Sequence, residues 1–286
     1  MYAVTGITGK VGGVVANTLL AAGKSVRAVV RDAAKGAEWA TKGCDVALAE
    51  MGDVTALTEA FSNAAGVFIL MPSNFSPSEG FPEVRKLASV LREALQVARP
   101  GKVVVISTIG AQATEPNLLN QLQIVEQELS KLDLPITFLR PGWFMENHLW
   151  DIEAAKSNGV IPSFLQPLDR AIPMIATADV GRVAAELLQE QWHGKRIVEL
   201  EAEEHVSPND IAATFAELLG KPVQVHAVPR DIWKELFISQ GSTNPVPRIQ
   251  MIDGFNEGWI CFEGQPRKGR VDLKTVLQGL LLKGVA

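Results

Sequence analysis

Four glycines stand close together behind the first apolar run of the chain, in the stretch VTGITGKVGG at residues 4–13. Glycine is required where the backbone takes a positive φ or where another group must approach the main chain closely. A strand followed by close glycines and then a helix brings a pyrophosphate onto backbone amides at the helix N-terminus. We interpret Gly6 as permitting the tight turn, Gly9 as the point of phosphate approach, and Gly12 as allowing the helix to pack closely on the strand.

Two other interpretations of this turn carry less weight. The spacing is GxxGxxG instead of GxGxxG, and a glycine-rich turn on its own can be purely structural. Its place at the first strand-to-helix junction favours the binding role. A nucleotide-hydrolysing P-loop is disfavoured, because Val11 follows Gly9 and Lys10 where a Ser or Thr is needed, and Val4 stands where the first P-loop glycine should be.

Strands and helices alternate over the first half of the chain and must hold the turn in place. Apolar runs typical of buried strands cover 2–5, 25–30, 45–49, 66–71, 102–107 and 135–140. Segments with helical spacing lie between them, at 11–22, 33–42, 54–62, 81–99 and 117–132. This order predicts an α/β fold with a Rossmann-type, doubly wound parallel sheet.

The rhythm changes after about residue 145. Helices are expected at 178–191, 208–219, 230–240, 246–257 and 272–283, strands near 197–201 and 223–228, and a proline-bearing loop at 161–173. We predict an NAD(P)-binding Rossmann domain over 1–145 and a smaller α/β lobe over 146–286. We expect this lobe to close over the sheet and form the substrate side together with the first domain.

The end of the second strand, RAVVRD, bears on the choice of cofactor. An acidic residue there accepts a hydrogen bond from the ribose of NAD, whereas an Arg pairs with the 2'-phosphate of NADP. Arg31 comes first and Asp32 follows, so we predict NADP as cofactor, with NADPH preferred over NADH and Lys35 as a second cation. The alternative is that Arg31 is an ordinary solvated charge.

Composition excludes several classes of function. With 27 Lys and Arg against 32 Asp and Glu, the net charge of -5 argues against direct binding of nucleic acid. Cys44 and Cys261 form neither a CxxC pair nor a disulfide framework, and no signal peptide is visible, so we expect a cytoplasmic protein. No apolar run is long enough to cross a membrane. We expect a small-molecule acceptor as partner, and a homodimer or a protein partner is left open.

With these residues in hand, the chain resembles an NmrA-like member of the atypical short-chain dehydrogenases/reductases. The resemblance is strongest to a bacterial branch of quinone, triphenylmethane-dye and azo reductases. It rests on VTGITGKVGG, the strand tip AVVRD, VVVISTIGA and above all ITFLRPGWFMEN at 136–147. It runs over nearly the whole chain, including IPMIATADVGRVAAELL at 172–188.

The resemblance implies site residues at matching positions. Around the pyrophosphate, beside the glycines, it implies Thr8, Lys10 and Val11, and at the 2'-phosphate it implies Arg31. For the adenine, ribose and nicotinamide it implies Glu50, Met51, Leu70, Met71, Pro72, Ser107 and Thr108. For the acceptor side it implies Pro141, Gly142, Trp143, Phe144 and Asn147. Asp53 lies in the turn after Glu50, and we interpret it as a helix cap.

The chain differs from the short-chain dehydrogenases at the residues that supply the proton in those enzymes. Those enzymes use a YxxxK pair to deliver a proton as hydride arrives. The single tyrosine here, Tyr2, is expected to be buried in the first strand. Leu122 stands where relatives carry His or Lys, while Glu126 matches the family's acid. We assign no catalytic residue.

Other candidates for chemistry are weaker. Ser107 follows a strand, where serine is more often a turn or cap residue, and His148 has no visible partner in the sequence. The remaining histidines show no metal-ligand spacing, so we assign no metal site.

Three functions remain in order of preference. The first is an NADPH-dependent reductase that passes hydride to a small electrophilic acceptor such as a quinone or azo compound, which needs no strong enzyme acid. Trp143 and Phe144 suit a flat aromatic acceptor, although core packing is an equally ordinary role for them. The second is a non-catalytic sensor of the NADPH to NADP ratio. A nucleotide-sugar epimerase ranks last, because it normally needs the missing tyrosine.

Overall fold

Within residues 1–283, the part of the chain that this computed structural model describes, eight strands form one parallel sheet in the order β12-β10-β6-β5-β4-β1-β2-β3. These strands are β1 (Tyr2–Val4), β2 (Val26–Val30), β3 (Asp45–Leu48), β4 (Gly66–Ile69), β5 (Val103–Ile106), β6 (Ile136–Pro141), β10 (Lys195–Glu201) and β12 (Arg267–Lys268). The strand order reverses between β1 and β4, because β2 and β3 lie on one side of β1 and all later strands lie on the other. Ligands of open α/β sheets bind at such a switch point, outside the carboxyl ends of the strands.

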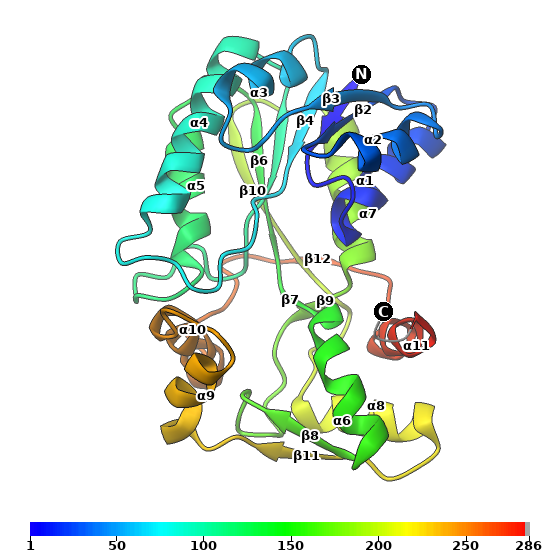
Figure 1. Cartoon of the computed structure of the whole chain (residues 1–286), viewed down its shortest axis with the longest axis vertical. Coiled ribbons are helices and arrows are strands. Elements are labelled where there is room, and N and C mark those ends of the chain that lie inside the picture. Colours follow the sequence, from blue (N-terminus) through cyan, green and yellow to red (C-terminus); the bar gives the residue numbers. More distant parts are fainter. Residues whose placement is uncertain (284–286) are drawn as a thin grey trace.

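Helices cover both faces of the sheet (Figure 1). One layer consists of α1 (Lys10–Ala21), α2 (Ala33–Ala40) and α7 (Thr177–Gln189), and the other of α3 (Val54–Phe61), α4 (Pro82–Ala98) and α5 (Asn120–Leu129). On α1, Val11, Val15 and Leu19 recur every four residues and are buried against the sheet. The predicted α/β fold with a doubly wound parallel sheet is confirmed.

A smaller lobe lies beyond the carboxyl ends of the strands, at the bottom of Figure 1. Its elements are β7 (Trp143–Phe144), η1 (Met145–Asp151), α6 (Ile152–Ser157), β8 (Val160–Ser163), β9 (Met174–Ile175), α8 (Pro208–Leu219), β11 (Gln224–Ala227), η2 (Arg230–Ile232), α9 (Trp233–Ser239), α10 (Val246–Glu257) and α11 (Leu273–Lys283). A separate hydrophobic cluster, centred on Phe215, Trp233 and Phe237, holds this lobe together.

The chain crosses between the two parts several times after residue 145. Gly181 lets α7 approach α1, because a Cβ there would lie 2.7 Å from the carbonyl oxygen of Val11. β10 pairs with β6 from Lys195 to Leu200, and β12 adds a short strand beyond it. The division at residue 145 stays a prediction, and the structure adds that α7, β10 and β12 contribute to the larger sheet layer.

The proline-bearing segment 161–173 is only partly a loop. Its first residues belong to β8, which pairs in parallel with β11, so that Ile161 lies opposite Val225. Proline at position 162 fits a short strand at a sheet edge. Proline has no N–H, and at an edge no neighbouring strand needs one as a hydrogen-bond donor. The expectation of a loop was wrong for this part, because proline alone does not exclude an edge strand.

Candidate functional site

The opening turn joins β1 to α1 at the switch point of the sheet. Gly6 has φ +60°, a conformation that favours glycine, and its carbonyl accepts a hydrogen bond of 2.9 Å from the Gly9 amide. The predicted role of Gly6 in the turn is therefore confirmed. Leu70, from the end of β4, closes the other side, since a Cβ on Gly6 would lie 3.2 Å from its Cδ2.

Gly12 and Gly9 differ in what excludes a side chain. A Cβ on Gly12 would lie 2.3 Å from the Gly6 carbonyl oxygen, so the turn folds directly onto the first turn of α1. Gly12 thus allows the helix to pack closely on the turn that follows β1, and not on the strand itself as expected from the sequence. At Gly9 a Cβ would meet only that same oxygen, at 3.3 Å, and φ is -90°, which other residues adopt. The described protein therefore demands glycine less strictly at position 9 than at position 12. Close approach of a ligand is a physical reason for glycine at position 9.

The first turn of α1 presents backbone amides without acceptors. The amides of Lys10, Val11 and Gly12 precede the first intrahelical bond, which runs from Gly13 to Gly9. Within the described part of the chain, no side chain caps this helix, and its first turn contains no acidic residue. Thr8 and Lys10 are exposed, whereas Val11 is 4% exposed and can offer only its amide. The arrangement suits an anion.

At the tip of β2, the acidic residue has a hydrogen-bond partner, and among the described residues the nearby cations have none. The Asp32 carboxylate caps α2 by accepting a hydrogen bond of 2.8 Å from the Ala34 amide. Arg31 and Lys35 are both exposed, and within residues 1–283 neither side chain forms a hydrogen bond or an ion pair. Two exposed cations near the tip of β2 therefore have no partner in residues 1–283, while the neighbouring acid already has a local one.

Thr5 fixes the position of the β4 tip relative to the turn. Its hydroxyl donates to the Phe68 carbonyl at 3.1 Å and accepts from the Leu70 amide at 3.0 Å. Sequence reasoning missed this residue, although a polar side chain at the end of an apolar strand was the available signal. Around it the predicted residues differ in exposure: Leu70 is half-buried, Met71 is buried, and Pro72 is exposed.

The residues predicted near the adenine lie at the end of β3. Glu50 is exposed and Met51 is half-buried. Asp53 caps α3 through a hydrogen bond of 3.0 Å from the Ala56 amide, as expected for a helix cap. The roles of Glu50 and Met51 toward a cofactor stay predictions.

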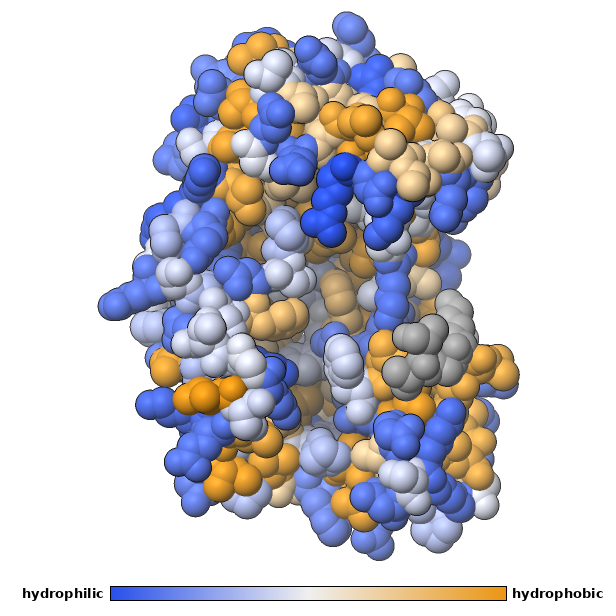
Figure 2. Space-filling view, viewed as in Figure 1, coloured by the Kyte–Doolittle hydropathy of each residue, from blue (hydrophilic) through white to orange (hydrophobic). Residues whose placement is uncertain are grey.

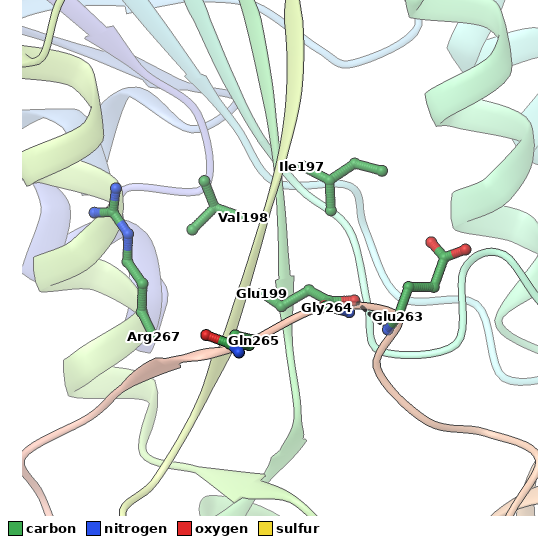
Figure 3. Close-up of a pocket in the computed structure, with 7 residues that line it drawn as sticks. All are labelled: Ile197, Val198, Glu199, Glu263, Gly264, Gln265 and Arg267. Carbon is green, nitrogen blue, oxygen red and sulfur yellow. Dashed lines mark hydrogen bonds between the residues drawn. The ribbon is translucent and has the colours of Figure 1, made fainter.

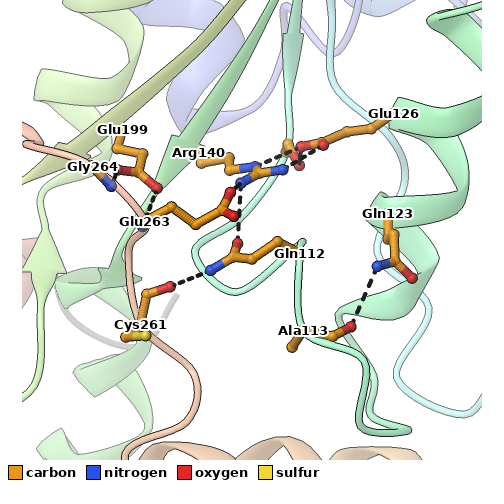
Figure 4. Close-up of polar contacts among 10 residues, drawn as sticks. Gln112, Ala113, Gln123, Glu126, Arg140, Glu199, Cys261, Glu263 and Gly264 are labelled. Carbon is orange, nitrogen blue, oxygen red and sulfur yellow. Dashed lines mark hydrogen bonds and ion pairs between the residues drawn. The ribbon is translucent and has the colours of Figure 1, made fainter.

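A buried polar network joins the tips of β5 and β6 (Figure 4). The Ser107 hydroxyl donates to Glu126 Oε1 at 2.5 Å, and the Arg140 guanidinium donates to both oxygens of that carboxylate at 2.9 and 2.7 Å. Burial lowers the pKa of Arg140, but hydrogen bonds and attraction from Glu126 and Glu263 outweigh burial and leave the pKa raised. Glu126 is therefore a partner of Arg140, and the Ser107 hydroxyl is directed toward it. Thr108, the next residue, is half-buried.

The same arginine connects the network to segments far away in the sequence. Arg140 Nη1 donates to Gln112 Oε1 at 3.0 Å and to Glu263 Oε2 at 2.7 Å. Gln112 in turn donates to the Cys261 carbonyl at 2.8 Å. Sequence reasoning did not single out Arg140, Gln112 or Glu263, although Arg140 lies inside the motif ITFLRPGWFMEN and a charged residue in an apolar strand was a signal.

The structure brings no tyrosine to this edge of the sheet. Tyr2 stands at the start of β1, at the opposite end of the strand from the turn, and it is half-buried, not buried as expected. Gly66 contacts it, since a Cβ on Gly66 would lie 3.0 Å from the Tyr2 ring. Leu122 packs partly buried against the core beneath α4 and α5.

The predicted acceptor residues follow β6 into the smaller lobe. Gly142 is required there, because a Cβ would lie 2.7 Å from the Pro173 carbonyl oxygen. Trp143 meets Phe255 edge to face, with ring centroids 5.2 Å apart, and its indole N–H is buried without a partner in residues 1–283. Phe144 packs into the cluster between the sheet and α1. The two rings thus contact different cores, because neighbouring residues of a strand point to opposite sides.

The other predicted acceptor residues differ in their surroundings. Pro141 is buried at the end of β6, whereas Asn147 is exposed in η1. His148, also in η1, does have a partner, contrary to the sequence-based expectation: its Nδ1 lies 2.7 Å from Asp151 Oδ2. The acceptor roles of these residues stay predictions.

A hollow of about 450 Å³ lies elsewhere, along the free edge of β10 (Figure 3). It is lined by Ile197, Val198, Glu199, Glu263, Gly264, Gln265 and Arg267. The Glu199 carboxylate accepts hydrogen bonds from the Glu263 and Gly264 amides at 2.9 and 2.8 Å, which holds that segment against the strand. β10 is four strands away from β1 in the sheet, roughly 19 Å. The hollow is therefore separate from the glycine turn.

Residues 1–283 contain no group of three or more His, Cys, Asp or Glu side chains that could hold a metal ion. None of the helices in this part of the chain combines the length and apolar character needed to cross a membrane.

Comparison with known proteins decides the family. The profile of the NmrA-like family matches residues 2–257, which is most of the chain. The chain belongs to the NmrA-like family. The resemblance inferred from the opening turn and the motif at 136–147 is thereby confirmed.

Relatives of this NmrA-like chain include named reductases. It is 26% identical over 259 residues to the NAD(P)H azoreductase of Xenophilus azovorans, covering 90% of this chain and 85% of that protein. It is 28% identical over 228 residues to quinone oxidoreductase 2 of Escherichia coli, covering 78% of this chain and 76% of that protein.

Solved structures share the fold of this NmrA-like chain. The triphenylmethane reductase of Citrobacter superposes with a TM-score of 0.81 at 20% identity, covering 98% of this chain and 99% of that one. The NADPH complex of the Escherichia coli quinone oxidoreductase gives 0.77 at 24% identity, covering 98% and 94%.

Proposed function

We propose that this protein is an NADPH-dependent reductase that transfers hydride to a small electrophilic acceptor of the quinone or azo class. The opening turn carries the proposal, since Gly12 must be glycine for the turn to fold onto unpaired amides at the start of α1. The acceptor class is supported by the names of the azoreductase and quinone oxidoreductase relatives. NADPH supplies the hydride when bound.

The residues of the chain would then act by binding and positioning. Backbone amides at Lys10 to Gly12 hold the pyrophosphate, and Arg31 with Lys35 attract the 2'-phosphate. The network of Ser107, Glu126 and Arg140 keeps the β5 and β6 tips in place beside the nicotinamide. Because the Ser107 hydroxyl and the Glu126 carboxylate already bond to each other, we assign protonation of the product to water. A quinone or azo acceptor allows this, whereas a simple ketone does not.

A second function, a non-catalytic NAD(P) sensor, is supported by the residues of α5. The position of the missing basic residue is occupied by Leu122, and Glu126 is engaged by Arg140, so no free acid or base stands in this part of α5. An NmrA variant also shares the fold, with a TM-score of 0.71 at 20% identity.

Turnover separates the two functions. Purified full-length protein is mixed with NADPH and a panel of benzoquinones, naphthoquinones and azo dyes, and the loss of NADPH absorbance is followed. A reductase oxidises NADPH only when both protein and acceptor are present. Tight NADPH binding without turnover on the entire panel would instead establish the sensor.

A further inference from the structure

Arg248, in the first turn of α10, is a half-buried cation without an anionic partner. Its guanidinium carbon lies 4.3 Å from the ring centroid of Phe237 and 5.8 Å from that of Phe75. Within residues 1–283, its side chain forms neither an ion pair nor a hydrogen bond, although a guanidinium has five N–H donors. Two aromatic rings therefore lie close to the charged group, and its donors have no partner in residues 1–283.

An arginine in this setting is costly unless something pairs with it. Burial lowers the pKa of Arg248, and no carboxylate of the described chain raises it again. Each guanidinium nitrogen nevertheless keeps some exposed surface. The donors are therefore not sealed off from solvent. Removal from bulk water strengthens the attraction between the guanidinium and an anion.

The wall that carries Phe75 is held in place by three contacts. Gln121 Nε2 donates to the Asn74 carbonyl at 3.0 Å, which ties the loop after β4 to α5. The hydroxyls of Ser76 and Ser242 lie 2.8 Å apart. Asn244 Nδ2 donates to the Pro77 carbonyl at 2.6 Å. The loop is thus fixed to the connector between α9 and α10, so the surroundings of Arg248 are formed before any ligand binds.

Helix α10 links Arg248 to the predicted acceptor side. The Pro247 carbonyl accepts a hydrogen bond of 2.9 Å from Leu118, in the segment that follows the β5 tip. Phe255 comes seven residues after Arg248, which places both on one face of the helix, roughly 10 Å apart along its axis. Phe255 packs edge to face on Trp143. In Figure 1, α10 lies just below the loops that leave β4 and β5.

We propose that Arg248 binds an anionic substituent of the electron acceptor, a carboxylate, sulfonate or phosphate, while the aromatic part of that acceptor lies toward Trp143. The planar guanidinium can donate two parallel hydrogen bonds to such an oxyanion. The rings of Phe75 and Phe237 lie within cation–π range of the guanidinium and restrict its position. This inference rests on the proposed reductase function and narrows its substrates to anionic aromatic acceptors.

The test compares two acceptors that differ by one anionic substituent. Dissociation constants of naphthoquinone and naphthoquinone sulfonate are measured by calorimetry on the full chain saturated with NADP, for the natural protein, Arg248→Gln and Arg248→Lys. Lys86→Gln, at an exposed site on α4, removes the same charge and is the matched control. We expect Arg248→Gln to weaken sulfonate binding about 10- to 100-fold relative to naphthoquinone. Arg248→Lys should retain part of the preference, and Lys86→Gln all of it.

Other results overturn the inference. If both acceptors weaken equally in Arg248→Gln, or neither weakens, the arginine only supports the loop at Phe75. If the affinity for NADPH falls instead, the guanidinium serves the cofactor. These binding ratios need no turnover, so an inactive protein with an intact sulfonate preference would refute the reductase function and leave the anion site standing. Conversely, the anion site alone would be refuted if the natural protein turns over both quinones and Arg248→Gln loses affinity for both equally.

Discussion

Two adjacent residues divide two tasks at the tip of β2. Asp32 begins α2 by accepting a hydrogen bond from the Ala34 amide, and Arg31 is exposed directly after the strand. Within residues 1–283, the capping carboxylate has a local partner while the arginine has none, and for this reason we predict that Arg31 favours NADP over NAD. The sequence predicted Arg31 as the cofactor cation from its position after a strand, and that role stays a prediction; the capping role of Asp32 was found only in the structure.

Replacing Arg31 by Ala should therefore weaken NADPH far more than NADH. The expected loss for NADPH is about 1.5–3 kcal/mol, the value of a charge-assisted hydrogen bond. Titration calorimetry with both dinucleotides measures it. Lys24→Ala, an exposed change of equal charge before β2, should alter neither affinity. Equal losses for NADPH and NADH in Arg31→Ala would show that the arginine does not contact the 2'-phosphate.

Other single residues were beyond sequence reasoning for a physical reason. The glycines could be predicted because a turn between a strand and a helix restricts the backbone locally. The partner of Arg140 could not, because Glu126 lies 14 residues away and Glu263 lies 123 residues away. Likewise, Trp143 and Phe144 were predicted as a pair, but the alternation of a short strand sends their rings to different cores.

Between elements, one buried ion pair joins α5 to β6. Side-chain exposure is 5% for Arg140 and 11% for Glu126, so solvation by water stabilises neither charge much. The bond from Ser107 brings the end of β5 into the same unit. Three elements at the edge where the nicotinamide is proposed to lie are thereby fixed to one carboxylate, which gives Glu126 a positioning role.

Glu126→Gln should lower the free energy of unfolding by about 3–5 kcal/mol, because it leaves the Arg140 charge buried with a weaker partner. Urea denaturation of the natural protein and the variant measures the difference. Glu263→Gln is the matched comparison: Glu263 pairs with the same guanidinium, but its side chain is 53% exposed. That variant should lose less than about 1 kcal/mol. Comparable losses in the two variants would contradict the positioning role of Glu126.

Long elements followed from the pattern of the sequence, and short ones did not. The helix at 208–219 and that at 246–257 match α8 and α10, which have clear starts at Ser207 and Pro245. The strands β7, β9 and β12 have two residues each, too few to show any periodicity. They form only because distant segments offer backbone partners, as β12 does along β10.

At the scale of the whole molecule, the sheet and the smaller lobe meet where the strands end. The loops after β4 and β5 lie between the helical layers and α10, and Figure 2 shows this face hollowed near its centre. The parallel sheet could be predicted, because buried strands and helices alternate regularly. The sequence could not predict how the later elements return to the sheet, because no local pattern in α7, β10 or β12 indicates which part of the molecule they join.

Binding of NADPH at the opening turn is the central claim, and titration calorimetry of the full chain tests it most directly. We expect NADPH to bind more tightly than NADH, and Gly12→Ala to abolish binding, because its Cβ would lie 2.3 Å from the Gly6 carbonyl oxygen. Gly52→Ala, where a Cβ would meet nothing within 4 Å, should bind normally. If neither dinucleotide binds to the natural protein, or if Gly12→Ala remains folded and binds as well, the account is wrong.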